Sequence, residues 1–147
     1  MQQEIQTAIR DVYDREHLAV LATVNDGQPY CSLVAFASSS DLKEIYFATR
    51  RDTQKFRNIQ RQPQVSLLVD TRNNRGIDFQ DAVAVTVLGK VREPTSLERL
   101  ERLNTFLEKV PYLREFTDSE DCALMVVNVK TYLVVSQFED VREWHIM

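Results

Sequence analysis

Apolar positions recur with two different periods along the chain of 147 residues. In Gln3–Arg15 they lie at i, i+3, i+4, i+7 and i+8, which is the stripe of an amphipathic helix. In Ala82–Val91, valines at alternate positions occupy one face, which is the period of a half-buried strand. The chain is therefore expected to combine amphipathic helices with strands that bury one face.

Turn and breaker residues divide the rest of the chain into short elements. Asn25-Asp26-Gly27 is a strong hairpin signal, and Pro63 and Pro111 each end a helical pattern. The predicted strands are Leu18–Val24, Gln28–Ala37, Glu44–Thr49, Gln64–Asp70, Ala82–Val91 and Cys122–Lys130, with Thr131–Ser136 as a final strand or a bent extension. The predicted helices are Gln3–Arg15, Thr53–Arg61 and Leu97–Lys109, and Thr71–Asp81 is predicted to be a polar loop.

The order of these elements points to a mainly β fold with peripheral helices. Strands and helices do not alternate regularly, so a doubly wound parallel sheet is disfavoured. A closed barrel is the simplest way to remove exposed sheet edges. We therefore expect a six- to seven-stranded antiparallel β-barrel, formed by a single domain over residues 1–147 because no linker or repeat interrupts the sequence.

Composition and charge exclude several classes of function. The net charge of −4 argues against nucleic acid as a partner, and no apolar run is long enough to span a membrane. A cytoplasmic location is the expectation, because the amphipathic N-terminus lacks the apolar core of a secretory signal. Cys31 and Cys122 are expected to be small buried hydrophobes. His17 and His145 are far apart in the sequence, so no metal site is expected.

A basic turn between a predicted strand and a predicted helix is the main candidate for chemistry. It places four basic residues against one acid in Thr49–Arg57, namely Arg50, Arg51, Lys55 and Arg57 against Asp52. Basic residues at a helix N-terminus are unfavourable unless an anion offsets them, and free N–H groups there suit a phosphate. The alternative is a solvated turn whose arginines pair with nearby acids.

The residues around this turn resemble the pyridoxamine 5′-phosphate oxidase-like, FMN-binding split-barrel family. The matching pieces, in order, are Gly27-Gln28-Pro29-Tyr30, Ser32-Leu33-Val34, Ile45-Tyr46-Phe47-Ala48-Thr49, Thr53-Gln54-Lys55, Arg57-Asn58-Ile59, Pro63, Val65–Val69 and Val87–Val91. The resemblance covers roughly Leu18 to Val135. It implies a split β-barrel that works as a homodimer, with the flavin in a groove between the subunits.

The resemblance also implies roles for individual residues. The FMN phosphate would be held by Thr53, Gln54 and Lys55, with Arg50 or Arg51 assisting. Ser32, Leu33 and Val34 would border the flavin ring through backbone atoms, and Ala48 and Thr49 would close the pocket on the phosphate side. Trp144, from the C-terminal segment of the second subunit, is the candidate aromatic that covers the flavin.

Departures from the family pattern argue against vitamin B6 oxidation. Ser32 stands at the position where the true oxidase has an arginine, and Ala84 stands where it has a glutamine. After its tryptophan the true oxidase also supplies an Arg and a His, where this chain has His145-Ile146-Met147. The sequence therefore favours an FMN-dependent oxidoreductase of an unknown small-molecule redox substrate, with no catalytic residue identified. The alternatives are a flavin- or haem-binding sensor or storage module without turnover, and a deazaflavin-dependent reductase.

Overall fold

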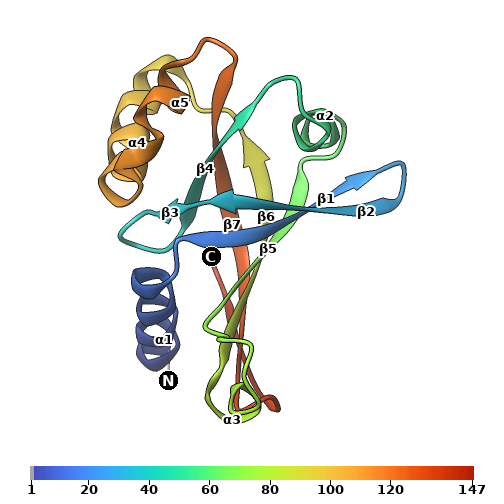
Figure 1. The fold of residues 1–147 in the computed structure, drawn as a ribbon, viewed down its shortest axis with the longest axis vertical. Coiled ribbons are helices and arrows are strands. Elements are labelled where there is room, and N and C mark those ends of the chain that lie inside the picture. Colours follow the sequence, from blue (N-terminus) through green and yellow to red (C-terminus); the bar gives the residue numbers. More distant parts are fainter. Residues whose placement is uncertain (1) are drawn as a thin grey trace.

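The computed structural model describes residues 2–147 (Figure 1). Its helices are α1 (Gln2–Arg15), α2 (Gln54–Arg61), α3 (Asp78–Asp81), α4 (Ser96–Lys109) and α5 (Arg114–Asp118), with a 3₁₀ turn at Pro111–Leu113. Its strands are β1 (Leu18–Asn25), β2 (Gln28–Ala35), β3 (Ala37–Ser38), β4 (Glu44–Arg50), β5 (Gln64–Asp70), β6 (Val83–Arg92), β7 (Cys122–Ser136) and β8 (Asp140–His145).

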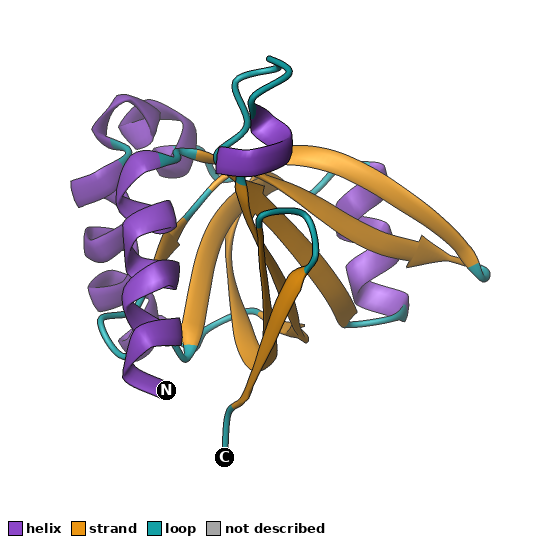
Figure 2. Ribbon diagram, turned by 90° about the horizontal axis from the view of Figure 1, so that it is seen from below, coloured by secondary structure: helices purple, strands orange, loops and turns teal. Residues whose placement is uncertain are grey.

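All the strands belong to one antiparallel sheet with the order β2-β1-β5-β6-β7-β4-β3, and β8 pairs with β7. The sheet curls strongly, and α1 lies along one side of it (Figure 2). The two strands at the ends of this order, β2 and β3, are consecutive in the chain and separated only by Phe36. The chain itself therefore joins the sheet's two edges, which confirms the predicted antiparallel split β-barrel.

Alternation along the strands places one face in the barrel interior. In β5, Val65, Leu67 and Val69 are buried, whereas their neighbours are partly exposed. Phe36 and Phe47 are fully buried in this interior. A second, smaller cluster lies under α4, where Leu103, Phe106 and Leu107 pack with Tyr46, Leu124 and Val126 of the sheet.

The structure differs from the sequence predictions at the C-terminal end and in one loop. Cys122–Ser136 is one continuous strand, so the predicted extension after Lys130 is part of β7. The strand β8 was not predicted, and α3 forms in the segment Thr71–Asp81 that was predicted to be a loop.

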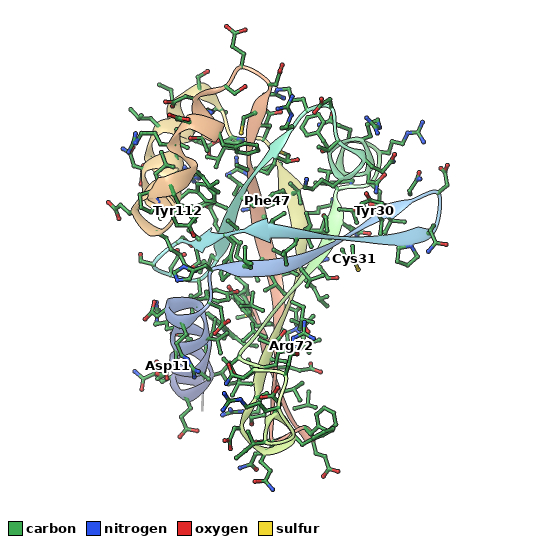
Figure 3. All side chains as sticks on the ribbon, in the orientation of Figure 1. Asp11, Tyr30, Cys31, Phe47, Arg72 and Tyr112 are labelled. Atoms are coloured by element: carbon green, nitrogen blue, oxygen red, sulfur yellow. The ribbon has the colours of Figure 1, made fainter. Side chains whose placement is uncertain are left out.

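The expectation that Cys31 is buried is wrong. Its side chain projects from β2 towards solvent, away from the interior that contains Phe47 (Figure 3). Cys31 pairs in register with Ala22, whose side chain lies on the outer face of the sheet, whereas the flanking Leu21 points inwards. Cys122 is buried, as predicted.

Candidate functional site

The opening between β2 and β4 is where the barrel is split. The two strands diverge on either side of Phe36, and α2 lies between their far ends (Figure 1). β2 pairs only with β1, and β4 pairs with β3 only at Tyr46 and Ile45. Within residues 2–147, the facing edges of β2 and of Phe47–Arg50 therefore have no strand neighbour. Such edges leave backbone N–H and C=O groups available to a ligand.

The structure brings nine of the ten sequence-predicted cofactor residues to the borders of this opening. Ser32, Leu33 and Val34 lie on β2; Ala48, Thr49 and Arg50 lie on β4; Thr53, Gln54 and Lys55 lie at the start of α2. These three elements, which are separate in the sequence, carry the two unpaired strand edges and the start of α2.

Two threonine hydroxyls hold the turn between β4 and α2. Thr49 is buried, and its Oγ1 lies 3.1 Å from Oγ1 of Thr53. The hydroxyl of Thr53 also donates to the carbonyl oxygen of Arg50 at 2.9 Å and accepts from the backbone N–H of Phe56 at 3.3 Å. Thr53 is therefore the N-cap of α2.

The backbone at this helix start retains free donors. The N–H groups of Gln54 and Lys55 make no hydrogen bond within the described part of the chain. Free N–H groups in the first turn are aligned with the positive end of the helix dipole. They form an arrangement that suits an anion.

The arginines of the turn are engaged with acids. Arg50 Nε lies 3.2 Å from Asp52 Oδ1, and Arg51 forms a two-pronged ion pair with Glu93 at 2.9 and 2.7 Å. The sequence left open whether these arginines bind an anion or pair with nearby carboxylates. In the structure, Arg50 and Arg51 pair with carboxylates. Neither arginine is a free cation at the opening.

Lys55 has no ion-pair partner among the described residues, like the exposed Arg57 at the end of the turn. Among residues 2–147 no carboxylate lies within 4.0 Å of the Lys55 ammonium group. The side chain is partly buried, and burial lowers the pKa of Lys55 below its ordinary value of 10.5. A phosphate beside it would offset this desolvation, because an opposite charge favours the protonated form.

Ser32 has a polar atom without a partner. Its Oγ is shielded from solvent and makes no hydrogen bond to another described residue. A buried hydroxyl without a partner costs about 1–3 kcal/mol, so the position favours an added polar group. Ser32 pairs with Leu21 on the inward face of the sheet, at the border of the opening. The residues present thus fit a phosphate-bearing cofactor with a polar flat ring.

Trp144 is the one predicted site residue that the fold places elsewhere. It lies on β8 opposite Tyr132, and the two rings stack at 5.5 Å between centroids and 12° between planes. Tyr132 belongs to β7, and Thr49 pairs with Ala123 of β7, which lies nine residues before Tyr132. At about 3.3 Å per residue, Trp144 is ~30 Å along the sheet from the basic turn of its own chain.

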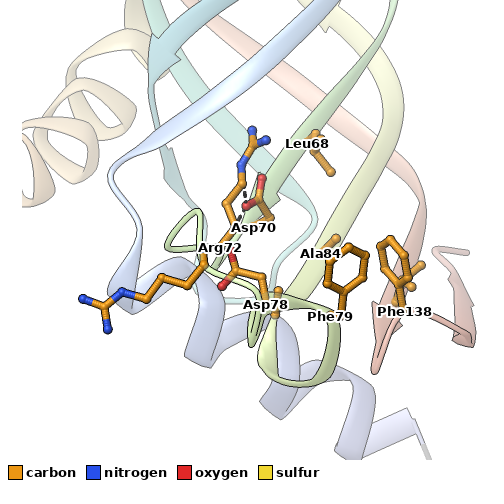
Figure 4. Close-up of a pocket in the computed structure, with 10 residues that line it drawn as sticks. Leu68, Asp70, Arg72, Asp78, Phe79, Ala84 and Phe138 are labelled. Atoms are coloured by element: carbon orange, nitrogen blue, oxygen red, sulfur yellow. Dashed lines mark hydrogen bonds and ion pairs between the residues drawn. The ribbon is translucent and has the colours of Figure 1, made fainter.

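The outer face of the sheet is apolar, which sequence reasoning missed. Leu33, Val20 and Leu68 are in register across β2, β1 and β5, and Leu33 is 63% exposed. Further along this face is a pocket of about 390 Å³ lined by apolar side chains of Leu68, Ala84, Val135, Phe79 and Phe138, with the Asp70–Arg72 ion pair at its rim (Figure 4). The sequence did contain a signal for this apolar outer face, because Leu18–Val24 has apolar residues at both alternating sets of positions.

None of the described helices is both long and apolar enough to cross a membrane. No group of three or more His, Cys, Asp and Glu side chains within residues 2–147 is arranged to hold a metal ion.

The sequence model of the family described as Pyridoxamine 5′-phosphate oxidase matches residues 5–142. The chain belongs to this family. A search of curated proteins gave no match.

Solved structures with the same fold carry different descriptions. A heme binding protein from Mycobacterium smegmatis has a TM-score of 0.83 at 18% identity, over 92% of this chain and 55% of that one. Campylobacter jejuni ChuZ has a TM-score of 0.81 at 15% identity, over 97% and 60%. A FAD-binding protein from Mesorhizobium loti has a TM-score of 0.66 at 20% identity, over 94% and 90%. The chain thus spans little more than half the length of the first two, and the likeness establishes the fold.

Proposed function

We propose that this protein binds a flavin in the opening between β2 and β4 and acts as a flavin-dependent oxidoreductase of a small-molecule substrate. The observation that carries the proposal is the unpaired Lys55 ammonium beside the free N–H groups of Gln54 and Lys55. Family membership and the matching spacing of Thr53-Gln54-Lys55 support the same assignment. In this proposal the phosphate is that of FMN or of a flavin that contains it.

Each part of the opening has a separate role in holding the cofactor. Lys55 neutralises the phosphate, while Thr53 fixes the helix start that presents the N–H groups. Arg50 assists if it exchanges its exposed ion pair with Asp52 for the phosphate. The free backbone edge at Ser32–Val34 orients the ring, and Ala48 and Thr49 close the phosphate side. When bound, the flavin supplies the electron-transfer chemistry, and the protein supplies binding and orientation.

A homodimer is part of the proposal because the opening adjoins the apolar outer face. Leu33 belongs to the segment that borders the ring, and it is also an exposed member of that face. A second copy covering the face would remove Leu33, Val20 and Leu68 from water and exclude solvent from the ring. Trp144 would cover a flavin only from this second copy, since its own basic turn is too far away.

The cofactor alternatives are separated by identifying the ligand itself. Mass spectrometry of the small molecule released from purified protein distinguishes FMN, FAD, a deazaflavin and haem. Anaerobic addition of NADH or NADPH then distinguishes an oxidoreductase from a binding module. Reduction of the bound flavin by either nucleotide supports the enzyme, whereas no reduction by both supports binding without turnover.

The phosphate site is tested with a single lysine variant. Lys55→Ala should weaken flavin binding by about tenfold or more, because a charge-assisted hydrogen bond contributes about 1.5–3 kcal/mol. The matched control is Lys130→Ala, an exposed lysine in the middle of β7, which should bind flavin like the unmodified protein. A protein that stays colourless and does not bind added flavin contradicts the proposal.

A further inference from the structure

A cleft of about 490 Å³ lies beside α2 and is lined almost entirely by hydrogen-bonding side chains without negative charge. The lining consists of three arginines, four amides and one aromatic ring, namely Arg51, Arg57, Arg61, Asn25, Gln54, Asn58, Gln60 and Phe56. No carboxylate belongs to this set, although the chain has 22 acidic residues and a net charge of −4. A concave surface that gathers one sign of charge concentrates ligands of the opposite sign.

The cleft is separate from the opening between β2 and β4. Neither Thr53 nor Lys55 lines it, and no residue of β2 or β4 does. At 3.6 residues per turn, Arg57 and Arg61 point about 160° and 120° away from Lys55 around the helix axis. Gln54 is common to both places, with its backbone N–H at the opening and its side chain in the cleft. The two sides of α2 therefore present two different anion-attracting surfaces.

A chain of hydrogen bonds from the core fixes the guanidinium of Arg57. Asn58 is 1% exposed, and its Nδ2 donates to Oγ1 of Thr23 at 2.9 Å. Its Oδ1 accepts from Nε2 of Gln54 at 2.7 Å, and Oε1 of Gln54 accepts from Nη2 of Arg57 at 3.3 Å. Nη1 of Arg57 donates to the carbonyl oxygen of Asp52 at 3.3 Å. Both acceptors of Arg57 are uncharged, so its position is fixed while its charge is not neutralised.

The other two arginines differ in how far carboxylates neutralise them. Arg51 is held by Glu93 in the two-pronged ion pair described above. Arg61 lies 3.8 Å from Asp26, but their side chains are 73% and 86% exposed, so this ion pair contributes little. Arg57 and Arg61 are four residues apart on α2, where like charges repel each other. A doubly charged oxyanion that accepts hydrogen bonds from both would offset this repulsion.

The rest of the cleft suits a polyhydroxylated organic group attached to that oxyanion. The volume of the cleft lies in the usual range of small-molecule sites, about 300–1,000 Å³, and is larger than an inorganic phosphate needs. The amides of Asn25 and Gln60 both donate and accept hydrogen bonds, which matches the hydroxyl groups of a sugar. The Phe56 ring, with the Arg51 guanidinium 5.5 Å from its centroid, adds a flat surface.

We propose that this cleft binds a phosphate monoester of a small polyhydroxylated molecule, that is, a sugar phosphate. The phosphate lies between Arg57 and Arg61, and the hydroxyl groups contact the amides of Asn25 and Gln60. The proposal does not depend on the proposed flavin site, because Lys55 and the opening take no part in it. It gives the protein a second ligand whose binding is independent of any redox cofactor.

Calorimetric titration with glucose 6-phosphate, glucose and inorganic phosphate, each measured separately, tests this proposal. The unmodified protein should bind glucose 6-phosphate at least about tenfold more tightly than either fragment. Arg57→Gln/Arg61→Gln should weaken this binding by at least about tenfold, as expected for lost charge-assisted phosphate contacts, and Arg61→Gln alone should weaken it in the same direction. The matched control, Arg15→Gln/Arg114→Gln, removes two exposed arginines outside the cleft and should bind like the unmodified protein.

Lys55→Ala separates the cleft from the flavin site, because it should leave the affinity for glucose 6-phosphate unchanged. Loss of this affinity in Lys55→Ala, with retention in the double arginine variant, would place the ligand in the opening and overturn the proposal. Equal affinity for glucose 6-phosphate and inorganic phosphate would show an ion site only and would also overturn it, as would no binding of glucose 6-phosphate. Circular dichroism of each variant shows that any loss of binding occurs in folded protein.

Discussion

The Asn58 side chain donates a hydrogen bond from Nδ2 to Oγ1 of Thr23 at 2.9 Å, and both residues are almost completely buried. Thr23 in turn donates to the carbonyl oxygen of Tyr30 at 3.4 Å. This contact joins α2 to the β1–β2 hairpin. It therefore fixes the helix start that carries Lys55 relative to the strand edge that carries Ser32.

Asn58→Ala should lower the free energy of unfolding by about 1–3 kcal/mol, because it removes a buried donor and leaves the Thr23 hydroxyl with one partner fewer. Chemical denaturation measures this loss. Gln60→Ala, an exposed change on the same helix, should stay within about 0.5 kcal/mol. If the two variants are equally stable, the contact contributes nothing to positioning α2.

Flavin affinity should fall as the pH rises into the alkaline range. Burial lowers the pKa of Lys55 in the free protein below 10.5, and a bound phosphate favours the protonated form. The complex then binds more protons than the free protein, so affinity decreases with pH. Titrations from neutral pH to pH 10.5 should show this slope, and Lys55→Ala should flatten it. A slope that survives in the variant assigns the proton to another group.

Leu33→Asp should convert the proposed dimer to a monomer, because it places a charge on the apolar face formed with Val20 and Leu68. Analytical ultracentrifugation measures the change, and flavin binding should weaken in parallel if the second copy closes the opening. Leu97→Asp is the control, since Leu97 is 93% exposed on α4. A monomeric unmodified protein contradicts the dimer.

Gly89→Ala should destabilise the fold by about 1–3 kcal/mol, since an added Cβ would lie 2.5 Å from the carbonyl oxygen of Asn128 and the backbone must move. Gly89 lies where the register between β6 and β7 shifts. Gly76 has open space around it and no positive φ, so Gly76→Ala should be neutral or stabilise by up to about 1 kcal/mol. Thermal unfolding of the pair measures both effects; equal melting temperatures would show that the bulge can relax.

Lys109 should make stability depend on pH. Its ammonium lies 3.7 Å from the centroid of the buried Phe36 ring, and burial lowers its pKa to about 8. Between pH 8 and the unfolded value of 10.5 the unfolded chain binds more protons, so this group makes the free energy of unfolding rise with pH. Burial also raises the pKa values of Tyr132 and Cys122 above their ordinary values, so these groups add a pH dependence of their own in the alkaline range. The test is therefore the difference between the unmodified protein and Lys109→Met, which should grow across this window; parallel curves would contradict the assignment.

Local patterns predicted those parts of the fold that local physics controls. The valines of β6 alternate into the core, and α2 begins and ends within one residue of the predicted helix Thr53–Arg61. The basic turn was visible from charge alone. The pairing of Arg50 and Arg51 with carboxylates, which leaves Lys55 unpaired, was not visible, because Glu93 lies 42 residues from Arg51.

The remaining features depended on tertiary pairing. β8 was missed because four of the six residues of Asp140–His145 are polar or charged, and its pairing with β7 holds it in the sheet. The outward direction of Cys31 could not be read from a strand with apolar residues on both faces, because a period of two does not say which face is inside.

The sequence by itself determined an antiparallel barrel and a basic turn at the start of a helix, because strand period, helix capping and local charge are properties of neighbouring residues. Only the tertiary structure decided which groups face the opening: it joined the sheet edges through Phe36, left Lys55 without a carboxylate, and withdrew Trp144 onto Tyr132. The physical reason is that burial and ion pairing are set by strand order, which brings together residues that are far apart in the chain.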